Sequence, residues 1–152
     1  MIKNYFKTPL ALIAFMGVIV TGCSSANTQQ SDETQVQQES TAQTLQGEWF
    51  ITQANDVNTV QYGDDASVTF DADGKANGRA VVNSFFGDYA LDGKSIQFDH
   101  VGATKMMGPE EEMKAESAIL QAINDAKSAT VDADKATIYD SKGKVVMTLK
   151  KK

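Results

Sequence analysis

Short segments of alternating apolar and polar residues, separated by tight-turn sequences, constrain the fold of this chain more than any other feature. Residues 66–70 alternate and are followed by Asp71-Ala72-Asp73-Gly74, while residues 88–91 lead into Asp92-Gly93, a strong two-residue hairpin signal. The segments with this character are residues 46–54, 66–70, 75–82, 88–91, 95–99, 129–132, 136–139 and 145–150. Strands spaced this closely predict an antiparallel meander or a barrel-like sheet of about eight short strands.

Residues 109–126 break this rhythm and predict one helix. Met113, Ile119 and Ile123 recur at helical spacing, as do Glu116 and Leu120. Pro109 suits a first helical position, and the three glutamates that follow it suit the positive end of the helix dipole. A cation site at these glutamates is the less favoured alternative. The fold class is therefore mainly β (α+β), with the helix packed across the open side of the sheet or barrel.

The N-terminus has the pattern of an export signal. Lys3 and Lys7 precede an apolar run over residues 9–20, which is shorter than the roughly 20 residues that cross a bilayer. The run ends at Gly22-Cys23, the only cysteine of the chain, in the arrangement of a bacterial lipobox. This predicts a lipoprotein signal over residues 1–22 and lipidation at Cys23, with a chance cysteine after an ordinary signal as the alternative.

Composition changes again after Cys23. Residues 23–44 are rich in Ser, Gln and Thr without aromatic residues, which predicts a lipidated, disordered tether. Residues 45–152 are long enough for one folded domain. The whole chain carries a net charge of −6, and loss of Lys3 and Lys7 with the signal leaves −8. Such an acidic chain is not expected to bind nucleic acid.

Several short motifs within residues 45–152 resemble the META domain, the family of HslJ-like envelope proteins. The motifs are Leu45-x-Gly47-x-Trp49, Val68-x-Phe70 with Gly74, residues 78–89, Thr104-x-Met106, and Glu116 ahead of Ile119-Leu120. The resemblance implies a non-enzymatic envelope protein that serves envelope maintenance or stress tolerance through binding. Ser24 after the lipobox cysteine resembles the outer-membrane sorting rule, so we expect the protein to be anchored there and to face the periplasm. We also expect it to be a monomer.

The chain departs from the family pattern at two positions. The family usually has cysteines where this chain has Val82 and Gly108, and their joint loss is coherent if those cysteines pair. Asn83, where a turn interrupts the apolar run, and Thr104 are retained. They either line a small polar site or serve the backbone structurally, and the structural alternative is favoured. Packing is likewise favoured over a ligand surface for Phe85, Phe86 and Tyr89.

No set of residues predicts catalysis, a metal site or a cofactor. His100, the only histidine, is expected to be exposed at a strand end. Asp71-Ala72-Asp73-Gly74 begins like a calcium loop but lacks its later ligands, so a hairpin turn is favoured. Two alternatives to the leading hypothesis are an inhibitor of an envelope enzyme and a carrier of a small apolar ligand. The carrier hypothesis requires a lipocalin-like cavity lined by Trp49, Phe70 and Phe98.

Overall fold

The computed structural model describes residues 45–152, so the predicted signal, Cys23 and the tether lie outside the described residues. The elements in chain order are β1 (Gly47–Ala54), β2 (Val57–Asn58), the 3₁₀ helix η1 (Val60–Asp65), β3 (Ala66–Phe70), β4 (Lys75–Ala80), β5 (Asn83–Asp92), β6 (Ser95–Ala103), α2 (Glu110–Asp125), β7 (Ser128–Asp132), β8 (Lys135–Tyr139) and β9 (Val145–Lys151). Within residues 45–152, no helix has the length and apolar character needed to cross a membrane.

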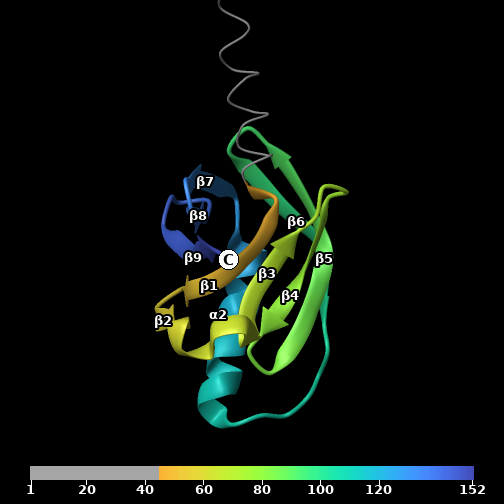
Figure 1. Ribbon diagram of the computed structural model, residues 1–152, viewed down its shortest axis with the longest axis vertical. Helices are drawn as coiled ribbons and strands as arrows, with labels where there is room; N and C mark the ends of the chain where they lie inside the picture. The colour runs from red at the N-terminus through yellow and green to blue at the C-terminus, as the bar shows by residue number, and fades with distance from the viewer. Residues whose placement is uncertain (1–44) are drawn as a thin grey trace, which may run out of the picture.

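Eight antiparallel strands form a closed barrel, which confirms the predicted fold class (Figure 1). Each strand from β3 to β8 pairs with the next along the chain, and β1 closes the circle by pairing with both β3 and β9. The shortest strand pairing in the barrel is between β6 and β7, which pair only at Ser95 and Ser128. The short strand β2 pairs with the end of β1.

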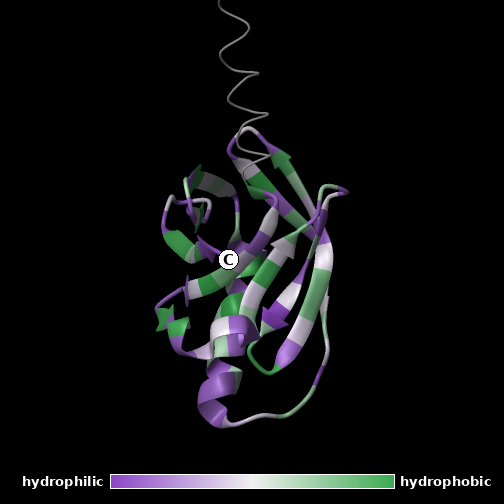
Figure 2. Cartoon of the chain, viewed as in Figure 1, coloured by the Kyte–Doolittle hydropathy of each residue, from purple (hydrophilic) through white to green (hydrophobic). Residues whose placement is uncertain are grey.

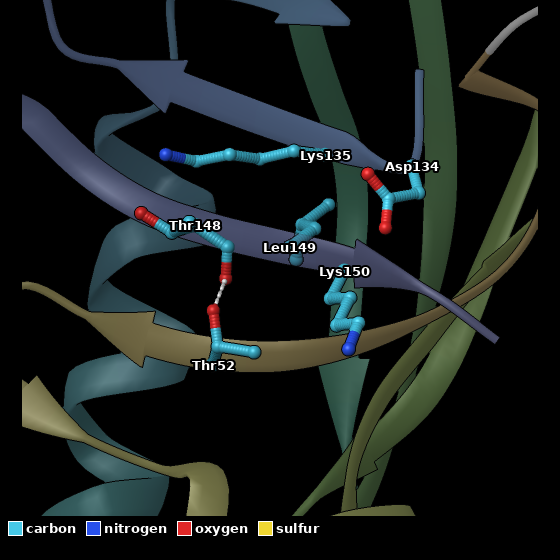
Figure 3. Close-up of a pocket in the computed structure, with 6 residues that line it drawn as sticks. All are labelled: Thr52, Asp134, Lys135, Thr148, Leu149 and Lys150. Carbon is cyan, nitrogen blue, oxygen red and sulfur yellow. Dashed lines mark hydrogen bonds between the residues drawn. The ribbon is translucent and has the colours of Figure 1, made fainter. Parts of the chain in front are cut away.

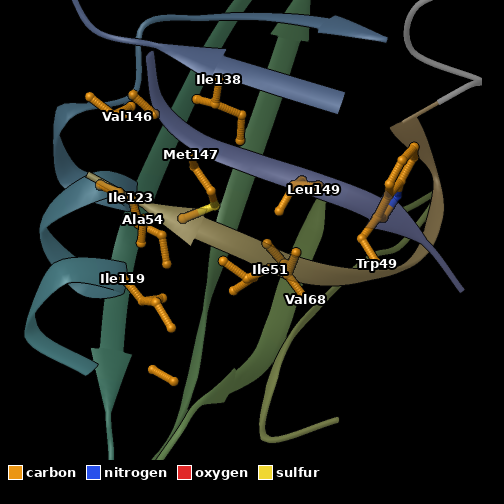
Figure 4. Close-up of a cluster of buried hydrophobic side chains, with 14 of the residues drawn as sticks. Trp49, Ile51, Ala54, Val68, Ile119, Ile123, Ile138, Val146, Met147 and Leu149 are labelled. Atoms are coloured by element: carbon orange, nitrogen blue, oxygen red, sulfur yellow. The ribbon is translucent and has the colours of Figure 1, made fainter. Parts of the chain in front are cut away.

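The interior is built from the alternation seen in the sequence, which is visible along the strands in Figure 2. Inward residues from β1, β3, β8 and β9 meet helix residues in one continuous core (Figure 4). Trp49, Ile51 and Leu149 are at most 1% exposed, and Ile119 from α2 is fully buried among them. Removing this apolar area from water is the main stabilising contribution to the barrel.

Helix α2 covers one end of the barrel and contacts β1, β2, β4 and β9 (Figure 1). Half of its buried residues are alanines, Ala115, Ala118 and Ala122, which lets the helix approach the strands closely. Pro109 occupies the N-cap rather than the first helical turn, and the three glutamates do fall in that turn. Helix packing across the open side was thus correctly predicted.

The turn between β4 and β5 differs from the prediction. It lies at Val81 and Val82, and Asn83 begins the next strand instead of turning the chain. Val81 has a φ of 62°, an uncommon conformation for a β-branched residue. Its N–H donates to the Asp65 carbonyl at 2.6 Å and its side chain is 5% exposed, so burial and this bond hold the turn.

Strands β5 and β6 are both longer than predicted. β6 continues to Ala103 because a β-bulge between Phe86 and Asp88 lets pairing resume beyond it. His100 therefore lies inside a strand, not at its end, with a φ of 53°. Tight packing elsewhere is set by Gly78, where an added Cβ would lie 2.1 Å from the Ser67 carbonyl oxygen.

Candidate functional site

Asn83 is the centre of a polar network at the end of the barrel that α2 covers. The side chain is 1% exposed at the start of β5. Its Nδ2 donates to the Met106 carbonyl at 3.1 Å and to Oε2 of Glu116 at 2.9 Å. Its Oδ1 accepts from the Thr104 hydroxyl and the Met106 N–H, both at 2.7 Å. One amide thus joins β5, the chain after β6 and the helix.

Thr104 and Glu116 complete this network. Thr104 Oγ1 also accepts the Ser84 N–H at 3.1 Å, which extends the β5–β6 ladder beyond the end of β6. Glu116 is 7% exposed, although it occupies a position of the helical apolar stripe. No buried side-chain nitrogen or oxygen in residues 45–152 lacks a partner. The structure therefore brings Asn83 and Thr104 together, and groups of the protein itself form all the hydrogen bonds of the Asn83 amide.

Val82 and Gly108 are in contact next to this network. A Cβ added to Gly108 would lie 3.4 Å from the Val82 Cβ and 2.6 Å from its nearest methyl. Disulfide-bonded cysteines have Cβ atoms about 3.5–4.5 Å apart. The two positions at which the chain departs from the expected family pattern are thus neighbours, close to disulfide spacing. Valine here fills the space that a side chain at residue 108 would need.

The connection over residues 104–109, here called the methionine loop, is fixed by these contacts but presents apolar side chains outward. Met106 is 55% exposed and Met107 is 93% exposed. Phe86, on the outer face of the adjoining β5–β6 ladder, is 57% exposed and its ring lies against Gly102. Phe85 packs in the core, whereas Phe86 packs on the strand surface and leaves more than half of its side chain in solvent.

A comparison with models of protein families identifies the family of this chain. Residues 42–152 match the META domain family. The chain belongs to the META domain family. No curated protein matches the chain.

Solved structures with a similar fold share little sequence with this META chain. One is the NMR structure of a protein from Burkholderia xenovorans, with 24% identity, a TM-score of 0.57, and coverage of 73% of this chain and 86% of that one. Another is the crystal structure of a DUF4847 family protein from Bacteroides vulgatus, with 16% identity, a TM-score of 0.53, and coverage of 72% and 94%. At these identities the likeness is one of fold.

The aromatic residues proposed to line a carrier cavity pack as core in the META barrel. Trp49 is fully buried and its Nε1 donates to the Leu45 carbonyl at 2.7 Å. Phe70 is 2% exposed and lies 5.0 Å from the Tyr89 ring and 6.1 Å from the Phe98 ring, measured between centroids. Burial, with the nearby Asp71 charge, raises the pKa of Tyr89. These side chains fill space at the barrel end opposite α2.

The remaining polar candidates lie at the surface. Nδ1 of His100 lies 3.0 Å from Asp88, which also pairs with Lys75. These partners lower the pKa of Asp88, through the hydrogen bond from Lys75 first and His100 second. Asp71 closes its turn by accepting the Gly74 N–H, as a hairpin would. In the described part of the chain, no three His, Cys, Asp or Glu side chains gather to hold a metal.

Sequence reasoning missed two parts of this region. Glu116 was assigned to the helix stripe without its role as the partner of Asn83, because the residues are 33 positions apart. The exposure of Met106 and Met107 was also missed, since methionine is usually buried. One sequence feature could have indicated the exposed loop. Met106 and Met107 lie in a short connection between Thr104, which directly follows a strand, and Pro109, which precedes the helix.

Proposed function

We propose that this META protein is a lipid-anchored, non-enzymatic envelope protein that acts by binding a protein partner through the methionine loop and Phe86. Cys23 carries the lipid, residues 23–44 form the tether, and the barrel faces the periplasm from the outer membrane. Envelope maintenance or stress tolerance is the process that this binding serves.

The observation that carries the proposal is a fixed backbone with exposed apolar side chains. Asn83 makes four hydrogen bonds, two of them to the Met106 backbone, while the Met106 and Met107 side chains remain in solvent. A fixed loop loses little backbone entropy on binding. Flexible, polarisable methionine side chains adapt to an apolar surface, and they are common where proteins bind partners. Exposed apolar groups of this kind mark interaction sites.

The position of the loop indicates the chemistry of its partner. Figure 1 places the loop and the start of α2 at one end of the barrel and the beginning of the described chain, just before β1, at the other. The loop would therefore point away from the anchoring membrane. Glu110, Glu111 and Glu112 follow it directly at the helix start. The partner we infer is a protein with an apolar patch bordered by basic residues.

Site-specific photocrosslinking in the bacterial envelope tests this proposal. A photoreactive residue at position 107 is expected to give one adduct of defined mass, and the same residue at position 142 in the β8–β9 turn is expected to give none. Extra unlabelled protein should compete the adduct away, whereas a Met106→Ser, Met107→Ser competitor should not. Equal adducts at both positions, or no adduct at position 107, would overturn the proposal. Tm of the double variant should match that of the parent, because both side chains are exposed.

The anchor is tested separately. Replacement of Cys23 with Ser should move the protein from the membrane fraction to the soluble periplasmic fraction, since acyl chains supply about 0.8 kcal/mol per buried methylene. A protein that stays with membranes after this change has another means of attachment, and the lipid assignment would then be wrong.

A further inference from the structure

A second surface, on the outer face of β1, β9 and β8, has the features of a small-ligand site. Two hollows lie side by side there and share Thr52 and Lys150 in their walls. The first, of about 260 Å³, is also lined by Asp134, Lys135, Thr148 and Leu149 (Figure 3). The second, of about 210 Å³, is lined largely by apolar groups, among them Phe50, Ile51 and Val60. A polar hollow thus adjoins an apolar one.

The positive charges that line the polar hollow exceed the negative ones, because Asp134 is the only acid beside Lys135 and Lys150. Lys135 and Lys150 are directly opposite in the β8–β9 register, an arrangement in which like charges repel. Figure 3 shows their side chains extending in different directions, Lys150 across β1 and Lys135 along β9. Neither ammonium group has an ion-pair or hydrogen-bond partner within residues 45–152. An anion bound between the two side chains would be attracted by both charges.

Hydroxyl groups add hydrogen-bonding capacity between the lysines. Thr52 donates to the Thr148 carbonyl at 3.0 Å and keeps its lone pairs for a further donor. The Thr148 hydroxyl has no hydrogen-bond partner in the described part of the chain and points outward in Figure 3. Two ammonium groups and one hydroxyl are therefore available to donate to a ligand. Asp134 offsets one of the two positive charges, so the hollow matches a head group with a single negative charge.

The adjoining hollow accepts the rest of such a ligand. Phe50, Ile51 and Val60 are among its lining residues, and Val60 is 60% exposed. Each hollow alone is smaller than the roughly 300 Å³ at which ligand pockets begin, so a ligand of that size would have to extend over both. We propose that this surface binds an amphiphilic monoanion, with a carboxylate or phosphodiester head between Lys135 and Lys150 and an apolar chain over Phe50 and Val60.

This site differs from a lipocalin-like carrier site because it lies on the outer wall of the barrel, whose aromatic interior is packed. It is also independent of the methionine loop, which belongs to the connection between β6 and α2. Either surface can therefore fail its test without affecting the other.

Binding of three probes to the chain from residue 23 onward, with Cys23→Ser, tests the inference by NMR amide shifts and calorimetry. Decanoate carries both required parts, acetate carries the head alone, and decyltrimethylammonium reverses the charge. Decanoate is expected to bind most tightly and to shift the amides of Thr52, Leu149 and Lys150. Equal binding of decyltrimethylammonium, or shifts confined to other strands, would overturn the proposal.

Variants separate the two hollows. Lys135→Ala with Lys150→Ala should weaken decanoate binding by about tenfold or more, because two charge-assisted hydrogen bonds are lost. Lys142→Ala with Lys144→Ala removes the same charge from the β8–β9 turn and should leave binding within about twofold, since a distant surface charge is screened. Val60→Ser should weaken decanoate and leave acetate unchanged. Equal losses in both lysine pairs would show that only net charge matters and would refute a defined site.

Discussion

The two ends of the META barrel are stabilised by different interactions, hydrogen bonds at one end and aromatic packing at the other. At the end covered by α2, Asn83 joins three segments through directed hydrogen bonds, and its partner Glu116 is 7% exposed. At the opposite end, Phe70 packs against Tyr89 and Phe98 through ring contacts. Hydrogen-bond networks demand the right donors and acceptors, whereas apolar packing demands the right volume. The helix end should therefore be sensitive to chemistry and the aromatic end to size.

The largest effect is expected at the aromatic end. Phe70→Ala should lower the free energy of unfolding by about 4 kcal/mol, since it removes a buried ring and leaves a cavity. Phe70→Leu, which keeps most of the volume, should cost about 1.5 kcal/mol. Urea unfolding of the two variants measures both values. If leucine proves as costly as alanine, specific ring contacts rather than volume hold this end.

A stabilising change is expected beside the Asn83 network. Val82→Cys with Gly108→Cys should form a disulfide in the oxidised protein, because the two Cβ positions lie 3.4 Å apart. A loop of this length predicts about 3.5 kcal/mol of stabilisation over the reduced form in the chain-entropy model. Tm compared with and without reductant measures the gain. Each single variant is the control, since it cannot form the bridge; an unchanged Tm on reduction would show that the present turn geometry does not admit the bond.

Changes at Asn83 test the chemical sensitivity of the helix end. Asn83→Ala should cost about 2 kcal/mol, because buried groups of Met106 and Glu116 lose their partner. Asn83→Asp has nearly the same volume but cannot donate to the Met106 carbonyl or to Glu116, and places two carboxylates together. It should therefore be less stable than Asn83→Ala at pH 7 and recover as the pH falls. An aspartate variant equal to wild type would remove the distinction between the two ends.

The sequence predicted regular features better than features set by distant contacts. Alternation and turn residues gave the strands, their number and the helix, because these depend on neighbours along the chain. The turn at Val81 was misplaced since its bond partner, Asp65, lies 16 residues earlier. For the same reason the sequence did not predict that Lys135 and Lys150 lie opposite one another, because this depends on the register between β8 and β9. The sequence indicated Asn83 and Thr104 as candidate polar site residues. The contact of Glu116 with Asn83 is evident only in the folded structure.

The smallest effect is expected from the exposed polar group Asp88, which contrasts with the buried network of Asn83. Lys75 and His100 lower the pKa of Asp88. The hydrogen bond to Asp88 and its negative charge in turn raise the pKa of Lys75. A depressed carboxyl pKa contributes stability that is fully present above the unfolded value, about 4, and is lost as the pH falls through the lower folded value. The difference in unfolding free energy between wild type and Asp88→Ala should thus shrink as the pH falls below 4. Because all three groups are exposed to solvent, 0.5 M salt should also reduce it. A difference that persisted at pH 2.5 and in high salt could not come from the ionised carboxylate, and the charge of Asp88 would then have no part in holding the β4–β5–β6 wall.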